Sequence, residues 1–320
     1  MFIKFSRRKL LFILPALAVL LAVWFISIYC IERGLTGRRQ ARFEETIPAS
    51  IAGKVESVRL RTSDGQNLGA WYLEGRGDLP ALVVAHGWGG CRSANLEYGL
   101  LFASEGYSVL LVTLRAHGDS SGEHVDFGYS ARNDVVAAVE YLEQRRPARR
   151  IFIFGRSLGA AAVAFAAEAL GNRAAGYVLE SVYADLRTAV RNRTKAILPP
   201  LVEPLVYWTM ILEAPAVDID FDLTQPAKVL AQMPTDIPVL VLSGAKDLHT
   251  VPAEAAAVFD AVRSHGKLVS FPNAGHYDLL TSDPQRYRTI LMDFLRKPAA
   301  TCRANERNTY EDAISVQTGK

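Results

Sequence analysis

The sequence predicts an α/β fold, in which a mostly parallel, doubly wound sheet follows one transmembrane helix. Six short, continuous apolar runs predict strands that are buried on both faces, as in a parallel sheet. Helical stretches between most of these runs predict the crossovers that join parallel strands. A longer, uncharged apolar run close to the N-terminus predicts the membrane span.

The apolar run extends from Leu10 to Ile31 and contains no charged side chain. About 20 apolar residues rising 1.5 Å each cross a hydrocarbon layer of roughly 30 Å. A cleavable signal peptide is the alternative, but its apolar region is usually about 7–15 residues long and ends in a small-x-small cleavage site. Here the run ends FISIYCIERG. We therefore interpret residues 10–31 as an uncleaved signal anchor, between a basic tail at 1–9 and a juxtamembrane linker at 32–50.

The orientation of this span is not set by its flanking charges, because basic residues stand in near-equal number on both sides. Long domains are translocated largely regardless of charge, whereas a short basic tail stays in the cytosol. We expect the large domain to lie on the non-cytoplasmic side of the membrane.

Residues 51–297 are predicted to form the folded domain. An alternating pattern on both sides of a Ser-Asp-Gly turn predicts a β-hairpin over residues 54–75. Buried strands are predicted at 81–87, 108–114, 150–155, 176–181, 238–244 and 267–272, and helices at 92–105, 130–145, 158–170, 253–265 and 284–296.

The alternation of strands and helices is interrupted once, at about residues 182–235, which are rich in proline and bulky apolar side chains. A structureless loop of this length is uncommon in a compact domain, so we predict a small helical lid insertion over one end of the sheet. Its cluster of Trp208, Met210 and Ile211 fits either an acyl-binding pocket or the core of the lid. The polar C-terminal tail at 298–320 carries little signal for burial.

Composition excludes several classes of protein. The net charge is only +3, and the chain lacks the basic stripe with interleaved aromatic residues that is typical of nucleic-acid binders. The three cysteines are widely spaced, and no His or Cys pair has the spacing of a zinc site. We therefore expect neither a nucleic-acid partner nor a metal.

The stretch GRSLG places Ser157 between a predicted strand and a predicted helix. The glycines on either side permit a sharp turn that presents the serine hydroxyl above the edge of the sheet. The helix that begins at Leu158 adds free N–H groups and the positive end of its dipole. A helix-capping serine in an ordinary crossover is the alternative interpretation.

A serine hydroxyl becomes a nucleophile only beside a base, and that base needs an orienting acid. Asp247 and His276 each follow a predicted strand, and the carboxyl ends of parallel strands share one edge of the sheet. The chain order Ser, Asp, His is the one expected for a nucleophile on such a strand-to-helix turn. We therefore predict that Ser157, Asp247 and His276 meet as a catalytic triad.

An oxyanion site is predicted at HGWGG, which follows the first long buried strand. Its glycines let backbone N–H groups approach a ligand closely. The N–H groups of Trp88 and Leu158 are the candidates to bind the negative charge of a tetrahedral intermediate. Among the remaining histidines, we expect His86 and His117 to stabilise the loops, and His249 is a candidate substrate contact.

The segments HGWGG, LRAHGDSSGE, GRSLG, GAKDLHTVP and NAGHYD occur in this order between about residues 55 and 297. In this respect the chain resembles the serine aminopeptidase-like, membrane-anchored α/β-hydrolases of the ABHD type. The resemblance implies an α/β-hydrolase fold, Ser157 as nucleophile, His276 as general base and Asp247 as acid. It also implies Trp88 and Leu158 as backbone oxyanion donors, and no cofactor.

Two positions depart from the pattern of that family. Pro252 follows Asp247 by five residues rather than four, so the acid loop has one extra residue. The third strand ends in Thr113-Leu114 before the Arg-Ala-His-Gly loop, where the family usually has an aspartate. The first departure weakens the assignment of Asp247, and the second leaves the triad untouched.

These features together predict a membrane-anchored serine hydrolase that cleaves an ester or thioester bond in a small-molecule or lipid-like acyl substrate. An amidase or peptidase is the alternative within the class, since the triad alone does not set the leaving group. The same framework would also suit a binding protein that keeps the fold without turnover, or a haloperoxidase-like or lyase activity.

Overall fold

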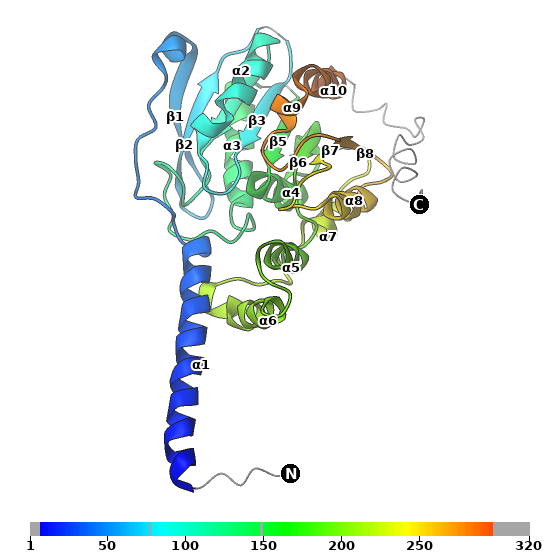
Figure 1. Cartoon of the computed structure of the whole chain (residues 1–320). Helices are drawn as coiled ribbons and strands as arrows, with labels where there is room; N and C mark the ends of the chain where they lie inside the picture. The colour runs from blue at the N-terminus through cyan, green and yellow to red at the C-terminus, as the bar shows by residue number, and fades with distance from the viewer. Residues whose placement is uncertain (1–6, 77, 148–149, 297–320) are drawn as a thin grey trace, which may run out of the picture.

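The computed structural model describes residues 7–76, 78–147 and 150–296, with the backbone alone at residues 7–12 (Figure 1). The predicted polar tail at 298–320 lies outside the described residues. So do residues 1–6 of the predicted basic tail.

A single eight-stranded sheet forms the centre of the domain, in the order β1-β2-β4-β3-β5-β6-β7-β8 (Figure 1). The predicted hairpin is present as the antiparallel pair β1 (Val55–Arg61) and β2 (Asn67–Leu73), and β2 continues antiparallel to β4 (Ser108–Val112). All remaining pairs are parallel, which confirms the predicted sheet. The other strands are β3 (Ala81–Ala85), β5 (Ile151–Arg156), β6 (Gly176–Glu180), β7 (Val239–Gly244) and β8 (Gly266–Phe271).

Helices cover both faces of this sheet. Val83 packs in the same buried cluster as α3 (Arg132–Arg145), α4 (Leu158–Leu170) and α8 (Pro252–Ala261). Its neighbours Leu82 and Val84 pack instead with α2 (Leu96–Ser104) and α10 (Pro284–Arg296). Because successive side chains of a strand point to opposite faces, the continuous apolar runs supply both layers of the core. The predicted doubly wound architecture is confirmed.

Most helix boundaries agree with the sequence prediction, and two differ. The helix expected at 253–265 ends at Ala261, because the polar residues that follow turn the chain into β8. The helix expected at 92–105 begins with the 3-10 turn η2 (Arg92–Asn95). Two more 3-10 turns, η1 (Ala49–Lys54) and η3 (Gly171–Arg173), and the short helix α9 (Leu279–Ser282) complete the described elements outside the insertion and the N-terminal helix. The insertion holds a further 3-10 turn, η4 (Ala214–Val217).

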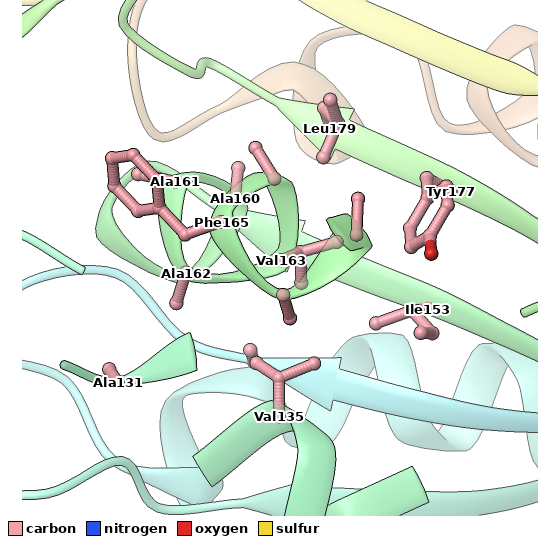
Figure 2. Close-up of a cluster of buried hydrophobic side chains, with 14 of the residues drawn as sticks. Ala131, Val135, Ile153, Ala160, Ala161, Ala162, Val163, Phe165, Tyr177 and Leu179 are labelled. Carbon is pink, nitrogen blue, oxygen red and sulfur yellow. The ribbon is translucent and has the colours of Figure 1, made fainter. Parts of the chain in front are cut away.

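Helix α4 packs closely against the sheet because its side chains are small. Its alanines form one buried cluster with residues of α3, β5 and β6, as Figure 2 shows for Ala160, Ala161, Ala162, Val163, Val135, Ile153 and Leu179. A Cβ atom on Gly159 would lie 2.5 Å from the carbonyl oxygens of Ala85 and His86. A Cβ atom on Gly155 would lie 2.5 Å from the carbonyl oxygen of Gly159. Only glycine fits at these two positions.

The N-terminal helix α1 (Arg7–Thr36) projects from the domain (Figure 1). Its residues 13–36 are long and apolar enough to cross a membrane. The helix continues beyond the predicted boundary at Ile31 into the residues expected to form a linker, because its last turn packs on the domain. Thr36 is buried, and its carbonyl oxygen accepts a hydrogen bond of 2.6 Å from the backbone N–H of Val125.

The predicted helical insertion between β6 and β7 is confirmed. It contains α5 (Leu186–Ile197), α6 (Glu203–Glu213), η4 and α7 (Pro226–Leu230). Both α6 and η4 pack against α1. The indole Nε1 of Trp24 in α1 donates a hydrogen bond of 3.0 Å to the hydroxyl of Thr209 in α6.

The packing of α4 predicts the effect of adding one methyl group. Gly159→Ala should destabilise the protein by about 1–3 kcal/mol, because the new Cβ overlaps backbone atoms that cannot move independently. Gly53→Ala is the matched control, since a Cβ at Gly53 meets nothing within 4 Å. Thermal unfolding of the full-length protein in detergent should show a lower Tm for the first variant alone. Equal Tm values for both variants would contradict this account of the turn.

Candidate active site

Ser157 occupies a strained turn between the end of β5 and the start of α4. Its backbone has φ 50° and ψ −114°, a conformation that a residue with a side chain rarely adopts. Such strain costs of order 1–3 kcal/mol and persists where the surroundings hold it in place. Here the backbone N–H of Ser157 donates a hydrogen bond of 2.8 Å to the carbonyl oxygen of Glu180 on the neighbouring strand β6. The turn therefore projects the hydroxyl beyond the carboxyl edge of the sheet.

The structure brings the three predicted triad residues together. His276, in the loop after β8, has its Nε2 2.9 Å from the Oγ of Ser157. Its Nδ1 lies 2.7 Å from the Oδ2 of Asp247, which is in the loop after β7. Because a carboxylate only accepts hydrogen bonds, Nδ1 donates to Asp247 and Nε2 is left to accept the proton of the Ser157 hydroxyl.

The carboxylate of Asp247 is buried and fixed by its own loop. Its Oδ1 accepts hydrogen bonds of 2.8 Å from the backbone N–H groups of His249 and Thr250. These bonds leave Oδ2 for the imidazole of His276. The extra residue in this loop therefore does not turn Asp247 away from the site.

A small hollow of about 110 Å³ opens beside Ser157. Trp88 forms part of its wall, whereas Leu158 does not line it. Leu158 is the first residue of α4, so its backbone N–H has no acceptor within the helix. The residues that line the hollow are Gly87, Trp88, Gly90, Ala94, Asn95, Arg156, Ser157, His276 and Tyr277.

Two other histidines stabilise the loops around this hollow, as expected. The backbone N–H of Leu114 donates to the Nε2 of His86, so the Nδ1 of His86 carries the proton and donates to the carbonyl oxygen of Gly87. His117 accepts in the same way from the N–H of Gly89 and donates to a backbone carbonyl. Burial lowers the pKa of His86 to about 3 and also lowers the pKa of His117. Both rings are therefore neutral and already hydrogen-bonded at neutral pH.

His249 lies beside the triad, with its ring centre 5.1 Å from that of His276. Burial, followed by the charge of His276, lowers its pKa. A role in contacting the substrate stays a prediction.

A buried charged cluster next to the nucleophile was not predicted from the sequence. Arg156 donates a hydrogen bond of 2.9 Å to Glu180, whose carboxylate is fully buried and also accepts from the hydroxyls of Tyr98 and Tyr287. Burial, reinforced by the charge of Glu180, raises the pKa of both tyrosines, so they stay protonated as donors. The signal was available in the sequence, because GYVLES ends an apolar strand in a glutamate that burial requires to be paired.

A contact between the N-terminal helix and the predicted oxyanion loop was not predicted either. The indole Nε1 of Trp88 donates a hydrogen bond of 3.1 Å to the carbonyl oxygen of Leu35, near the end of α1. The guanidinium of Arg39 lies 4.7 Å from the centre of the same ring. The segment that we expected to act as a linker therefore packs on a wall of the site.

The helical insertion does not line the hollow. Within residues 182–235, all of which are described, no side chain contributes to its wall. Trp208 is 61% exposed, so the structure supports neither the acyl pocket nor the lid core that we considered for this residue. The reason is that α6 packs against α1 rather than over Ser157.

Comparison with known proteins is consistent with this architecture. A sequence model of the alpha/beta hydrolase family matches residues 82–290. An uncharacterized protein of Mycobacterium tuberculosis is 31% identical over 271 residues, which cover 81% of this chain and 86% of the relative. An uncharacterized membrane protein of Saccharomyces cerevisiae is 24% identical over 263 residues, covering 80% and 84% respectively.

Solved structures share the fold at lower sequence identity. A Pyrococcus furiosus esterase aligns with a TM-score of 0.65 and 20% identity, covering 81% of this chain and 99% of the esterase. From the match to the family model and the 31% identity to the mycobacterial relative, we conclude that the chain belongs to the alpha/beta hydrolase family.

Proposed function

We propose that this protein is a membrane-anchored serine hydrolase that cleaves a carboxylic ester or thioester through an acyl-enzyme intermediate. The observation that carries the proposal is the continuous row of hydrogen bonds from Ser157 through His276 to Asp247, at 2.9 and 2.7 Å. This is the arrangement that makes a serine hydroxyl nucleophilic at neutral pH.

In the first half of the reaction, the Oγ of Ser157 attacks the carbonyl carbon of the substrate, and its proton passes to the Nε2 of His276. Asp247 stabilises the imidazolium that forms. The carbonyl oxygen becomes an oxyanion, and the backbone N–H groups of Trp88 and Leu158 are the proposed donors to it. One such donor typically contributes about 10²–10³ in rate, because the charge appears only in the transition state.

The tetrahedral intermediate then collapses, and the bond from the carbonyl carbon to the leaving oxygen or sulfur breaks. His276 returns the proton to the leaving group, which departs as an alcohol or thiol. Water then gives a proton to His276 and attacks the acyl carbon. Collapse of this second intermediate releases the carboxylic acid and restores the Ser157 hydroxyl.

Three further observations support an acyl substrate at a membrane. The P. furiosus protein with the same fold is an esterase, and the yeast relative is described as a membrane protein. The exposed, apolar part of α1 suits a signal anchor. We propose that the domain lies on the non-cytoplasmic side, because long domains are translocated largely regardless of charge.

Ser157→Ala should abolish labelling of the full-length protein by a fluorophosphonate probe and lower the hydrolysis of p-nitrophenyl esters by about 10³-fold or more, because no other group replaces the attacking oxygen. Ser63→Ala removes an exposed hydroxyl in the turn between β1 and β2 and should leave both signals unchanged. Labelling that survives in the folded Ser157→Ala protein would exclude this serine as the nucleophile.

Asp247→Asn should lower kcat by roughly 10⁴-fold while the protein stays folded, because the amide holds His276 in the wrong tautomer. The amide oxygen can still accept from the N–H groups of His249 and Thr250, so the loop keeps its anchor. Asp260→Asn, on the exposed surface of α8, is the control. A loss of less than tenfold for Asp247→Asn would show that another group orients the base.

Membrane orientation can be read from two C-terminal fusions expressed in a bacterial host. Alkaline phosphatase, which folds in the periplasm, should be active when fused after residue 320, and green fluorescent protein at the same place should be dark. The reverse pattern would place the domain in the cytoplasm.

A further inference from the structure

The exposed face of α6 is apolar, whereas the exposed face of a helix in water is polar. Leu205, Trp208 and Leu212 follow each other at helical spacing and are 59%, 61% and 70% exposed. Leu201, one turn earlier, is 93% exposed, and Ile197 at the end of α5 is 75% exposed. A water-facing helix buries its apolar stripe and exposes its polar face, and contiguous exposed apolar surface marks a site of interaction.

The polar groups of α6 point inward instead. Glu203 is buried, and its carboxylate accepts a hydrogen bond of 2.7 Å from Thr194 and pairs with Arg191 at 3.3 Å. The guanidinium of Arg191 also stacks over the ring of Tyr207 at 4.3 Å. These contacts to α5 fix the rotation of α6 about its axis, so the apolar stripe is held outward.

The position of α6 relative to α1 indicates what covers this stripe. Figure 1 shows α6 beside α1, farther from the sheet than α5. The contact between Trp24 and Thr209 lies about 10 Å along the helix axis from Ile31, where the apolar run ends, at 1.5 Å per residue. Interfacial helices bury their apolar face about 5–10 Å into the boundary between headgroups and acyl chains. Thus α6 lies at the depth of such a helix wherever α1 spans a bilayer.

The charge on α5 fits the same placement. This helix carries four basic side chains and no acidic one, in the sequence LRTAVRNRTKAI. Arg187 and Lys195 are exposed. Helix α5 lies between α6 and the sheet (Figure 1). When α6 is inserted in the bilayer, α5 is therefore at the level of the lipid headgroups. Basic residues there attract anionic phospholipids.

We propose that α6 is an interfacial membrane helix, whose face formed by Leu205, Trp208 and Leu212 inserts into the bilayer that α1 crosses, together with Leu201 in the turn before it. Basic residues of α5 bind the anionic headgroups of the same leaflet. This inference rests on the membrane anchoring in the proposed function. Its consequence is that the domain has a fixed tilt at the membrane, because α1 and α6 hold it at two points.

A photo-crosslinking experiment on the full-length protein tests this placement. p-Benzoylphenylalanine is introduced singly in place of Leu205, Leu212, Leu20 or Leu100, and each protein is reconstituted into vesicles of phosphatidylcholine and phosphatidylglycerol. Leu20 lies in α1 and is the reference for lipid exposure, and Leu100 is an exposed leucine of α2, on the far side of the domain (Figure 1). After irradiation, the intact mass should rise by one phospholipid for positions 20, 205 and 212, and not for position 100.

The remaining outcomes overturn the proposal in distinguishable ways. Lipid adducts at position 20 without adducts at 205 and 212 would leave the anchor standing and exclude insertion of α6. Adducts at none of the positions would exclude the anchor as well. Adducts of twice the protein mass at 205 and 212 would show that a second copy of the chain covers the stripe. The readout needs no activity, so it does not depend on the role of Ser157.

Discussion

The site depends on the close approach of α4 to the sheet, which two glycines permit. Gly159 brings the start of α4 against the carbonyl oxygens that end β3, and Gly155 lets the chain reverse immediately after β5. Ser157 is therefore held with a positive φ at the rim of the sheet, with the N-terminus of a helix directly after it. The strands that precede Asp247 and His276 run parallel to β5 and end at the same rim. The glycines thus set the position of the nucleophile, and the shared rim of the sheet brings Asp247 and His276 within hydrogen-bond reach of it.

Buried charged side chains next to this turn stabilise it. The carboxylate of Glu180 accepts hydrogen bonds from Arg156 and from two tyrosines that burial keeps protonated, so no charge is left unpaired at the base of the turn. The backbone carbonyl of the same residue accepts the N–H of Ser157. Removing one partner of a buried ion pair typically costs about 3–5 kcal/mol, so the pair of Arg156 and Glu180 stabilises the two residues that contact the turn at Ser157.

The strands and most helices could be predicted because their apolar periodicity is local. The meeting of Ser157, Asp247 and His276 could be predicted because the carboxyl ends of parallel strands share one edge of the sheet. Two contacts could not be predicted, that of Leu35 with Trp88 and that of Trp24 with Thr209. Each joins residues that are far apart in the chain, and no sequence motif marks them. The same contacts explain two differences from expectation. The linker at 32–50 begins as helix because its first turn packs on the domain, and α6 packs on α1 instead of covering Ser157. Hydropathy indicates that Trp208 is apolar, but it does not indicate whether the side chain is buried in the protein or exposed.

We propose that Ser157, His276 and Asp247 act on an acyl group whose oxyanion is bound by the N–H groups of Trp88 and Leu158. The most direct measurement is an experimental structure of the full-length protein after reaction with an alkyl fluorophosphonate, whose adduct resembles the tetrahedral intermediate. We expect phosphorus bonded to the Oγ of Ser157, and one phosphonyl oxygen about 2.7–3.1 Å from both backbone nitrogens. An adduct on another residue would exclude Ser157 as the nucleophile, and a phosphonyl oxygen that contacts neither nitrogen would exclude the proposed oxyanion donors.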